Sequence, residues 1–297
     1  MDVAITGSHG LIGKALAASL EADGHSVRPV VRSGGGAGAV TWDLDAGRID
    51  AAGLEGVHAV VHLAGEGIAS ARWTEEQKRR IHDSRTQGTT LLSGAIAGLD
   101  QKPKALVSGS AIGIYGSDRG DHVLTETSGL GHDFLAGVCK DWEASTALAE
   151  EAGIRVAHLR SGVVLSGKGG ALATQLPIFK LGLGGPAGSG RQWLSWVSLD
   201  DEVAAIRFLI DHDVSGPVNV AAPAAVTNAE FTKALGRALR RPTFLRIPRL
   251  VAKAPMGIGD LAGSLLFASQ RVAPAVLEAN GFRFSHPDLD GALQTVI

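Results

Sequence analysis

The sequence predicts an α/β protein, with a doubly wound parallel sheet and a smaller C-terminal α/β lid domain. Three observations support this fold class. Short apolar runs alternate with helical patterns as far as residue 165. A glycine-rich turn separates the first apolar run from the first helical pattern. Beyond residue 165 the alternation gives way to segments broken by glycine and proline. We therefore predict a nucleotide-binding domain over residues 1–165 and a substrate or lid domain over residues 166–297.

The composition indicates a sizeable apolar core and little net charge. Of the 297 residues, 45% are apolar, and the formal net charge is −2. Such a balance argues against nucleic acid or an anionic membrane as the main partner. No apolar run approaches the roughly 18 residues of a membrane-spanning helix, and Met1 leads into a strand rather than a signal peptide. We expect a cytoplasmic protein with a small-molecule substrate.

The cysteine and histidine content predicts that no metal is bound. Cys139 is the one cysteine, which excludes an internal disulfide and any site with several cysteine ligands. The ten histidines are scattered, without the spacing of a metal site.

The first predicted strand, residues 3–5, ends in a glycine-rich turn before an amphipathic helix. Gly7 permits the tight turn, Gly10 lets the backbone approach a pyrophosphate, and Gly13 lets the helix pack against the strand. The start of a helix offers unpaired N–H groups and a partial positive charge to phosphates. The spacing predicts a Rossmann-type dinucleotide site rather than a turn without a ligand. Its predicted contacts are Gly7, Ser8, His9, Gly10, Leu11, Ile12 and Gly13.

The second predicted strand, residues 27–31, ends in Arg32 and Ser33. In a Rossmann domain this end meets the adenosine ribose, where an acidic side chain would accept a hydrogen bond from the 2′-hydroxyl of NAD. Arg32 instead suits the 2′-phosphate of NADP, because a guanidinium pairs well with phosphate oxygens. The alternative is a solvated surface arginine. We predict NADP as the cofactor, with Arg32 and Ser33 among its contacts.

Strands and helices continue to alternate along this domain. A third strand is predicted over residues 40–43, and a fourth over residues 59–63 runs into Ala64 and Gly65. Small residues at such a strand end let a cofactor lie across it. The next elements are a helix from Glu75 past Ile96 with a capping box of Thr74 and Gln77, a strand at residues 105–107, a helix at 132–151 and a strand at 156–159. This alternation predicts parallel strands with right-handed crossovers.

A glycine-rich loop at residues 182–190 leads into the candidates for the substrate side. These are Arg191, Gln192, Trp193 and Trp196. Arginine can clamp a carboxylate or phosphate, and tryptophan can stack on a sugar or an aromatic ring. Alternatively, the two tryptophans pack the lid onto the sheet. The predicted elements that follow are a helix at 198–210, a strand at 218–220, a helix with a capping box of Thr227 and Glu230, and short helical pieces over 242–297.

Several segments resemble the extended short-chain dehydrogenase/reductase superfamily. These are the glycine motif and residues 63–65, 115–116 and 160–162. A closer resemblance is to an atypical, epimerase-like family within it, carried by residues 63–66, 72–73, 83–85, 110–116, 181–186 and 188–193. Members of this family end in a C-terminal domain of unassigned role, which residues 281–284 and 287–289 resemble and which would take about the last 50 residues here.

The resemblance implies an NADP cofactor and places residues around it. Arg32 would meet the 2′-phosphate, Leu63 and Ala64 would line the adenosine side, and Val163 would sit near the nicotinamide. Arg85 would contact the cofactor or the substrate. We also assign Ser108 to the cofactor side and Glu66 to the substrate side.

The catalytic pattern of this superfamily is incomplete in the sequence. Extended short-chain dehydrogenases use Asn, Ser or Thr, Tyr and Lys, with the Tyr and Lys four residues apart on one helix face. The lysine lowers the phenol pKa so that the tyrosine can move a proton. In this chain the two alternative registers on the helix give Leu135 with Cys139, or Ala136 with Lys140. Either register lacks the phenol, and the Asn position holds Arg85.

The candidates that remain for catalysis are Ser110 and Tyr115, the one tyrosine of the chain. Ser110 is the plausible survivor of the serine position. Tyr115 could replace the missing phenol. The structural alternative is favoured, because the same Tyr-Gly pair is mostly structural in the superfamily that the chain resembles. Cys139 reads as a buried core residue rather than a nucleophile. Asp200 and Asp201 read as helix-start charges rather than a catalytic pair.

Two functions follow from this sequence. The first is an NADP-dependent, epimerase-like oxidoreductase with a non-standard acid or base. The second is a catalytically inactive NADP-binding protein that senses redox state or regulates a partner.

Overall fold

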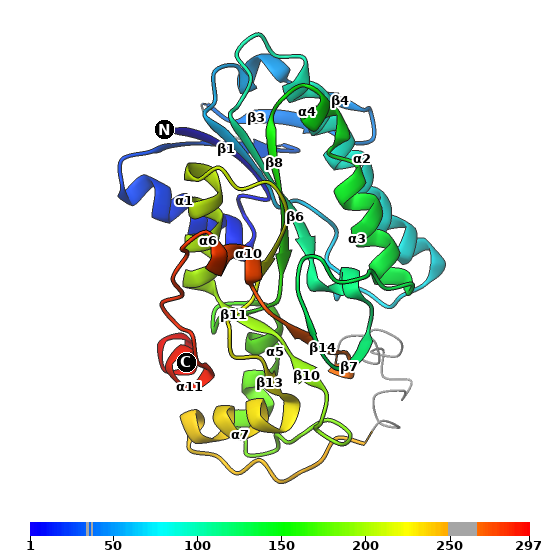
Figure 1. Ribbon diagram of the computed structural model, residues 1–297, viewed down its shortest axis with the longest axis vertical. Helices are drawn as coiled ribbons and strands as arrows, with labels where there is room; N and C mark the ends of the chain where they lie inside the picture. Colours follow the sequence, from blue (N-terminus) through cyan, green and yellow to red (C-terminus); the bar gives the residue numbers. More distant parts are fainter. Residues whose placement is uncertain (34–35, 37, 249–265) are drawn as a thin grey trace.

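Figure 1 shows the computed structural model, which describes residues 1–33, 36, 38–248 and 266–297. Within these residues, eight strands form one sheet in the order β12-β8-β6-β5-β1-β2-β3-β4. All pairings are parallel except that of β3 with β4. The predicted α/β fold with a doubly wound, Rossmann-type sheet is therefore confirmed. The strands are β1 (Asp2–Thr6), β2 (Ser26–Val31), β3 (Val40–Asp43), β4 (Arg48–Ile49), β5 (Ala59–His62), β6 (Ala105–Ala111), β8 (Arg155–Ser161) and β12 (Gly216–Val220).

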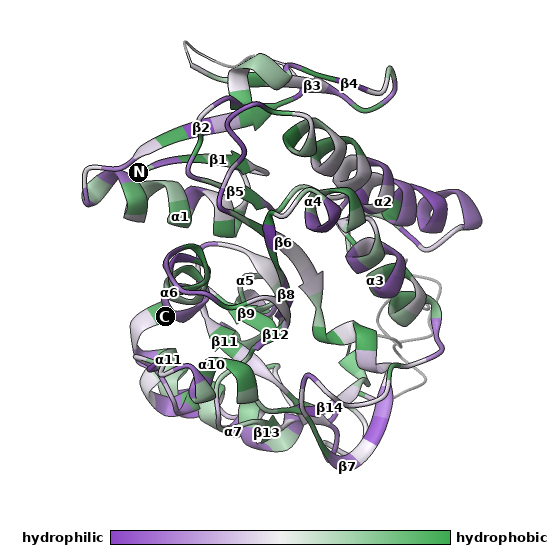
Figure 2. Cartoon of the chain, turned by 45° about the horizontal axis from the view of Figure 1, so that its top comes forward, coloured by the Kyte–Doolittle hydropathy of each residue, from purple (hydrophilic) through white to green (hydrophobic). Residues whose placement is uncertain are grey.

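Helices cover both faces of the sheet, as Figure 2 shows. Helices α1 (Leu11–Ala22) and α6 (Leu199–Asp211) pack side by side on one face. The other face carries α2 (Glu75–Ala97), α3 (Phe134–Ala144) and α4 (Ala147–Glu151). This arrangement buries the central strands from both sides.

The two layers explain why the strands read as continuous apolar runs. Val3 and Ile5 of β1 pack in one cluster with Leu16 of α1, whereas Ala4 packs in another with Leu92 of α2. Successive side chains of a strand point to opposite faces. A parallel strand covered on both faces therefore favours apolar side chains at successive positions.

The helix predicted over residues 132–151 is two helices, α3 and α4, so that prediction was wrong. The Ser145 hydroxyl donates to the Asp141 carbonyl at 2.7 Å, and the Thr146 hydroxyl donates to the Glu143 carbonyl at 2.8 Å. Hydroxyls bonded to carbonyls of the preceding turn compete with the backbone ladder and favour a break.

The two predicted capping boxes have different outcomes. At α7 (Asn228–Leu239) the reciprocal bonds between Thr227 and Glu230 are both present, which confirms the box. At α2 the Thr74 hydroxyl accepts from the Gln77 N–H at 3.1 Å. However, the Gln77 side chain donates to Glu66 at 3.2 Å instead of closing the box.

The chain after β8 builds the lower part of the molecule in Figure 1 and also returns to the sheet. Both α6 and β12 follow residue 165 yet belong to the layers of the main sheet. The division into domains at that residue stays a prediction, and the pieces predicted within residues 249–265 lie outside the described residues. The remaining elements are η1 (Ala51–Leu54), η2 (Ile112–Tyr115), β7 (Asp118–Leu124), β9 (Val163–Leu165), α5 (Gly170–Lys180), β10 (Trp193–Leu194), β11 (Trp196–Ser198), β13 (Val226–Thr227), β14 (Ser269–Val272), α10 (Ala275–Ala279) and α11 (Leu289–Val296).

The strand order has a switch point at the carboxyl ends of β1 and β5, where doubly wound sheets have their ligand-binding crevice. These strands are neighbours, but the helix after β1 and the helix after β5 cover opposite faces. In doubly wound sheets, ligands bind at such a switch point. The glycine turn after β1 and residues 63–65 after β5 both lie at this edge.

Candidate cofactor and substrate site

The glycine turn between β1 and α1 leaves no room for side chains. Gly7 has a φ of +68°, and a Cβ on it would lie 2.9 Å from the Leu63 carbonyl carbon. A Cβ on Gly13 would lie 2.3 Å from the Gly7 carbonyl oxygen. Helix and strand therefore approach each other as closely as the predicted role of Gly13 requires.

The first turn of α1 keeps its N–H groups available. Helices α2, α3, α6, α7 and α11 each begin with a side chain that accepts from the backbone. Within the described residues α1 has no such cap, and its first turn carries no acidic side chain. His9 and Gly10 are exposed next to it, while Ser8 is buried. An uncapped helix start behind a glycine turn suits a pyrophosphate.

The backbone at the end of β5 is fixed by Thr6 of β1. The N–H groups of Leu63 and Ala64 both donate to the Thr6 hydroxyl oxygen, at 3.0 and 3.1 Å. The same hydroxyl lies 2.7 Å from Nδ1 of His62, which is fully buried. Burial lowers the pKa of His62 to about 4, so its ring is neutral at pH 7. The sequence did not predict Thr6 and His62 as site residues, because side chains within a buried strand are expected to pack in the core.

Two arginines approach the crevice from different sides. Arg32 is exposed beyond the end of β2, and no described acidic side chain forms an ion pair with it. Arg85 of α2 lies against Gly65. A Cβ added to Gly65 would lie 3.3 Å from the guanidinium carbon of Arg85. It donates from Nη1 to the carbonyls of Glu66 at 2.9 Å and Ile81 at 3.0 Å.

The environment of Arg85 suits an anionic group. Burial lowers its pKa, and its guanidinium lies 5.0 Å from the ring centroid of Trp142. In the part of the chain that the structure describes, no carboxylate forms an ion pair with Arg85. A half-buried cation without a carboxylate in an ion pair is a natural contact for a phosphate or a substrate carboxylate.

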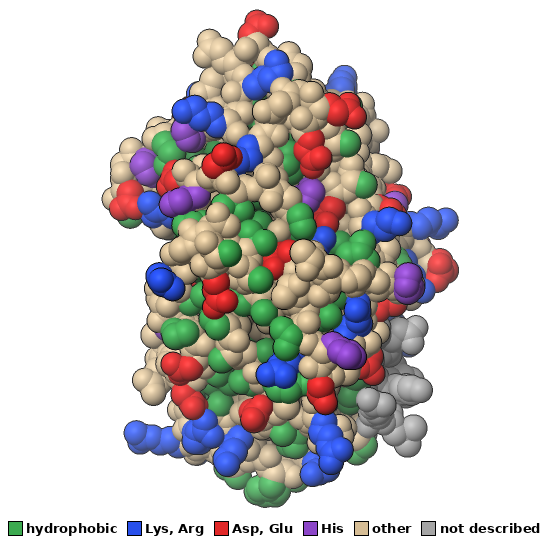
Figure 3. Space-filling view, viewed as in Figure 1, with side chains coloured by type: hydrophobic (Ala, Val, Ile, Leu, Met, Phe, Trp, Pro, Cys, Tyr) green, Lys and Arg blue, Asp and Glu red, His purple; other side chains and the backbone are tan. Residues whose placement is uncertain are grey.

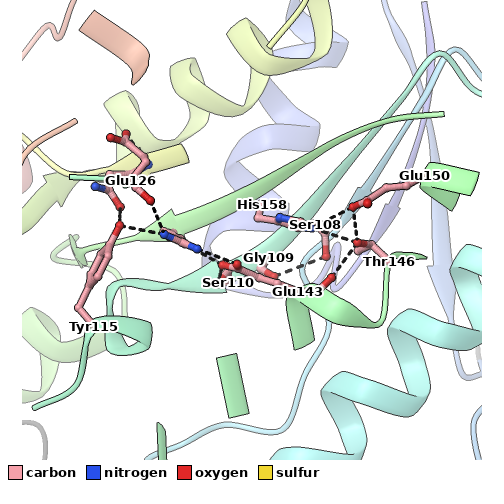
Figure 4. Close-up of polar contacts among 11 residues, drawn as sticks. Ser108, Gly109, Ser110, Tyr115, Glu126, Glu143, Thr146, Glu150 and His158 are labelled. Carbon is pink, nitrogen blue, oxygen red and sulfur yellow. Dashed lines mark hydrogen bonds and ion pairs between the residues drawn. The ribbon is translucent and has the colours of Figure 1, made fainter. Parts of the chain in front are cut away.

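The catalytic candidates Ser110 and Tyr115 belong to one buried polar network, shown in Figure 4. Ser110 donates to Glu143 at 2.7 Å. Arg160 of β8 donates to both carboxylate oxygens of Glu143 at 2.8 Å and to the Tyr115 hydroxyl at 3.0 Å. The Tyr115 hydroxyl donates to the side chain of Asn219 at 2.7 Å. We call Ser110, Tyr115, Glu143, Arg160 and Asn219 the buried network.

The buried network explains the protonation of its members. Tyr115 is fully buried, and burial raises its pKa, so it holds its proton at pH 7. Burial acts to lower the pKa of Arg160, but the hydrogen bonds and charge of Glu143 raise it overall. A fully buried phenol with two partners matches the structural alternative for Tyr115. Catalytic roles for Ser110 and Tyr115 stay predictions.

Cys139 and Asp201 are both buried among protein groups. Burial raises the pKa of Cys139 to about 12, and its side chain packs with Ile112 and Tyr115. This agrees with its interpretation as a core residue. Asp201 lies in the first turn of α6, as expected for a helix-start charge, and also accepts from the N–H groups of Ser285 and His286.

The four substrate-side candidates divide into two groups. Trp196 is fully buried in the core between α5 and α7, and its indole N–H donates to the Ala224 carbonyl at 3.1 Å. It packs rather than facing a substrate, which corrects its assignment. Arg191 is exposed, while Gln192 bonds the Ala187 and Leu266 carbonyls.

Trp193 is held between two neighbouring strands. Its indole N–H donates to Asp121 of β7 at 2.7 Å, and the Arg271 guanidinium of β14 lies 4.4 Å from its ring centroid. Glu66 is placed elsewhere, beyond β5, where hydrogen bonds from Ser70 and Gln77 lower its pKa. No described contact joins Glu66 to Trp193.

Two hollows on the surface lie away from the glycine turn. One of about 390 Å³ is lined by residues 115–119 and 129–133, and one of about 430 Å³ lies between α2 and α3. Over the face shown in Figure 3, acidic and basic side chains are interspersed.

Across residues 1–33, 36, 38–248 and 266–297, no cluster of three His, Cys, Asp or Glu is arranged for a metal ion. The helices in those ranges are also too short or too polar to cross a bilayer.

Glu202 is a buried carboxyl that the sequence analysis did not single out. It lies in the first turn of α6, is fully buried, and accepts from the Ser161 hydroxyl at 2.6 Å. Its Oε2 has no partner among the described residues. Burial raises its pKa to about 7. Ser161 ends β8 two residues before Val163, so this carboxyl lies next to the expected nicotinamide side.

The Glu202→Gln variant should change how stability depends on pH. Between pH 4.5 and pH 7 the unfolded chain has lost the Glu202 proton while the folded protein retains it. Stability of the natural protein therefore falls with rising pH through this group, by about 3 kcal/mol in total. We expect the variant to gain that much relative stability over this range, measured by urea unfolding at several pH values.

Comparing the natural protein with the Glu202→Gln variant cancels the contributions of groups that titrate in both. His62 has a lowered pKa and acts with the opposite sign, but it is present in both proteins. A difference between the two proteins that stays constant with pH would contradict the assignment of this proton to Glu202.

Family models match almost the whole chain. The model of the NAD dependent epimerase/dehydratase family matches residues 3–221. A model called domain of unknown function, DUF1731, matches residues 247–296. This agrees with the resemblance to an epimerase-like family that ends in a C-terminal domain of unassigned role.

Relatives with curated sequences are similar over nearly their full lengths. The epimerase family protein Mb2239 of Mycobacterium bovis is 45% identical over 293 residues, which cover 98% of this chain and 96% of that protein. The human epimerase family protein SDR39U1 is 36% identical over 300 residues, covering 100% of both chains.

Two solved structures show the same fold at substantial identity. The crystal structure of human SDR39U1 isoform 2 with NADPH has a TM-score of 0.91 and 36% identity, and covers 100% of this chain and 99% of that chain. The nucleoside-diphosphate sugar epimerase of Corynebacterium glutamicum has a TM-score of 0.82 and 39% identity, covering 100% of this chain and 58% of that chain.

Proposed function

Because this chain belongs to the NAD dependent epimerase/dehydratase family, we propose that it is an NADP-dependent, epimerase-like oxidoreductase that works without a Tyr-Lys pair. The observation that carries the proposal is the uncapped start of α1, which follows Gly7 and has Gly13 in its first turn. Among the described residues α4, α5 and α10 also begin without a side-chain cap, so it is the uncapped start together with the glycine turn that suits a phosphate. The NADPH in the crystal structure of human SDR39U1 supports the same cofactor for this chain.

The proposed cofactor lies across the crevice, from β2 to β8. Its pyrophosphate rests on residues 7–13, and its 2′-phosphate meets Arg32 and Ser33. The loop after β5 lines its adenosine side through Leu63, Ala64 and Gly65, whose positions Thr6 helps to fix. Ser108, Arg85 and Val163 complete the proposed contacts.

When bound, NADPH would supply a hydride to a substrate carbonyl, and water would supply the proton that the reduced oxygen needs. The chain would bind and orient that carbonyl through Ser110, whose single hydroxyl proton would turn from Glu143 to the carbonyl oxygen. Arg191, Gln192, Trp193 and Glu66 are the proposed substrate contacts. Tyr115 would stabilise the loop beside them, since its proton is already shared within the buried network.

The test of this function is turnover. Purified protein with NADPH should oxidise the cofactor in the presence of some member of a panel of carbonyl compounds and nucleotide sugars. Arg191→Ala should lower that rate without changing NADPH affinity. Tight NADPH binding with no turnover on any panel would overturn the enzymatic proposal.

The second candidate is an NADP-binding sensor or regulator without catalytic activity. It is favoured by the missing phenol, because the tyrosine position holds Leu135 or Ala136 in the two registers. A partner protein that binds with NADPH present and not with NADP⁺ would support it over the first.

Arg32→Ala should separate NADPH from NADH. We expect it to weaken NADPH binding roughly tenfold to a hundredfold, because a charge-assisted hydrogen bond to the 2′-phosphate is lost. NADH lacks that phosphate, so its affinity should stay unchanged. Calorimetric titration of both cofactors measures the two effects.

Arg48→Ala is the matched control, since Arg48 is an exposed arginine of β4. It should leave both affinities unchanged. Equal losses for NADPH and NADH in the Arg32 variant would place Arg32 away from the 2′-phosphate.

A further inference from the structure

The η2 turn after β6 is held in place by a residue from the end of the chain. Gln270 of β14 is buried, and its side-chain amide donates to the Ile112 carbonyl at 3.0 Å and to the Gly116 carbonyl at 2.7 Å. These two carbonyls stand at the beginning and just beyond the end of η2. One amide group therefore spans the whole turn that links Ser110 to Tyr115.

Strand β14 is itself fixed on both sides. It pairs in parallel with β7, and Figure 1 shows it running beside β7 and β10. The Ser195 hydroxyl donates to the Gln270 carbonyl at 2.8 Å and accepts from the Val272 N–H at 2.8 Å. The η2 turn and the segment around Trp193 are thereby joined through β14.

A second connection reaches the buried network. Asn219 donates to the Ala273 carbonyl at 3.0 Å and accepts from the Tyr115 hydroxyl at 2.7 Å. The N–H groups of Asn219 and Val276 both donate to Glu126 at 3.1 Å. Tyr115 of η2 is thus linked to the C-terminal region through Asn219 of β12, in addition to the pairing of β14 with β7.

The position of η2 in the fold gives this contact a functional meaning. Strand β6 lies on the side of β5 away from β1, whereas Arg32 follows β2 on the opposite side. A dinucleotide with its adenosine at β2 places its nicotinamide towards β6 and β8. The η2 turn continues directly from β6, so its position shapes the nicotinamide end of the crevice.

We propose that the C-terminal region, whose role is unassigned, shapes the nicotinamide half of the cofactor site, and that Gln270 is its positioning residue. The proposal rests on the proposed NADP function. Gln270 acts through the η2 turn and does not touch the cofactor. The N-terminal sheet would thus bind the adenosine and phosphate groups, and the C-terminal region would position the turn beside the nicotinamide.

Gln270→Glu tests the proposal with a change of nearly equal size. An ionised carboxylate accepts hydrogen bonds and donates none, so it repels both carbonyls. The matched control is Gln175→Glu, because Gln175 also donates its amide to a carbonyl, that of Ala171, but on α5. Hydrogen exchange of residues 112–117 should accelerate in the Gln270 variant and stay unchanged in the control.

Two ligands separate positioning from general destabilisation. NADPH should bind the Gln270 variant roughly tenfold more weakly. 2′,5′-ADP, which has the adenosine half and no nicotinamide, should bind as it does to the natural protein. Ser195→Ala should act in the same direction and replaces the first variant if that one does not fold.

The outcomes distinguish this inference from the function it rests on. Unchanged NADPH affinity, or equal losses for NADPH and 2′,5′-ADP, would overturn the role of Gln270. If the natural protein binds no NADPH, the proposed function fails, and unchanged exchange in residues 112–117 would then also exclude the contact with η2.

Discussion

Replacing Gly13 by alanine is expected to remove most of the affinity for NADPH. The added Cβ would lie 2.3 Å from the Gly7 carbonyl oxygen and 2.8 Å from the Ser8 Cα. Both neighbours are backbone atoms of the proposed phosphate turn, so the turn must move to accept the methyl group. Overpacking of this kind costs roughly 1–3 kcal/mol. If this cost is taken from the free energy of NADPH binding, the affinity falls roughly tenfold to a hundredfold.

Gly137→Ala is the matched control for this change. Gly137 also lies within a helix, α3, and a Cβ there meets nothing within 4 Å. Alanine should leave NADPH affinity unchanged and favour the helix slightly. Calorimetric titration and thermal unfolding of both variants make the comparison. A Gly13 variant that binds NADPH like the natural protein would remove the glycine turn from the cofactor site.

Glu143→Gln should be strongly destabilising, by roughly 3–5 kcal/mol. Glu143 and Arg160 form a buried ion pair, with side-chain exposures of 12% and 5%. The substitution keeps the shape but leaves the Arg160 charge without its carboxylate, and Ser110 loses a charged acceptor. Urea unfolding measures the free energy.

Arg237→Ala is the control for that prediction. It breaks the ion pair between Arg237 and Asp290, whose side chains are 52% and 60% exposed, respectively. Surface pairs of this kind contribute about 1 kcal/mol or less. A loss for Glu143→Gln no larger than that of this control would show that the buried network does not stabilise the fold.

The differences between the expected and the observed structure have two origins, contacts between distant residues and local hydrogen bonds of side chains. Trp193 and Trp196 are three positions apart in the sequence, yet the Trp196 indole is fully buried and the Trp193 indole is partly exposed. Helix α3 ends early because the Ser145 and Thr146 hydroxyls bond backbone carbonyls of the preceding turn. The hydrophobic pattern of the sequence does not indicate these bonds. Glu202 reads as a helix-start acid until its burial under the sheet is known.

The sequence by itself determined the α/β class, most of the strands and the glycine turn, because each depends on residues close together in the chain. Gly7 and Gly13 are six positions apart, and the apolar runs record burial on two faces. The tertiary structure decided the surroundings of Tyr115. Its partners Arg160 and Asn219 are 45 and 104 positions away, and Gln270 reaches Gly116 across 154 positions. Such pairs have no periodicity in a sequence, since only the packing of the folded chain brings them together.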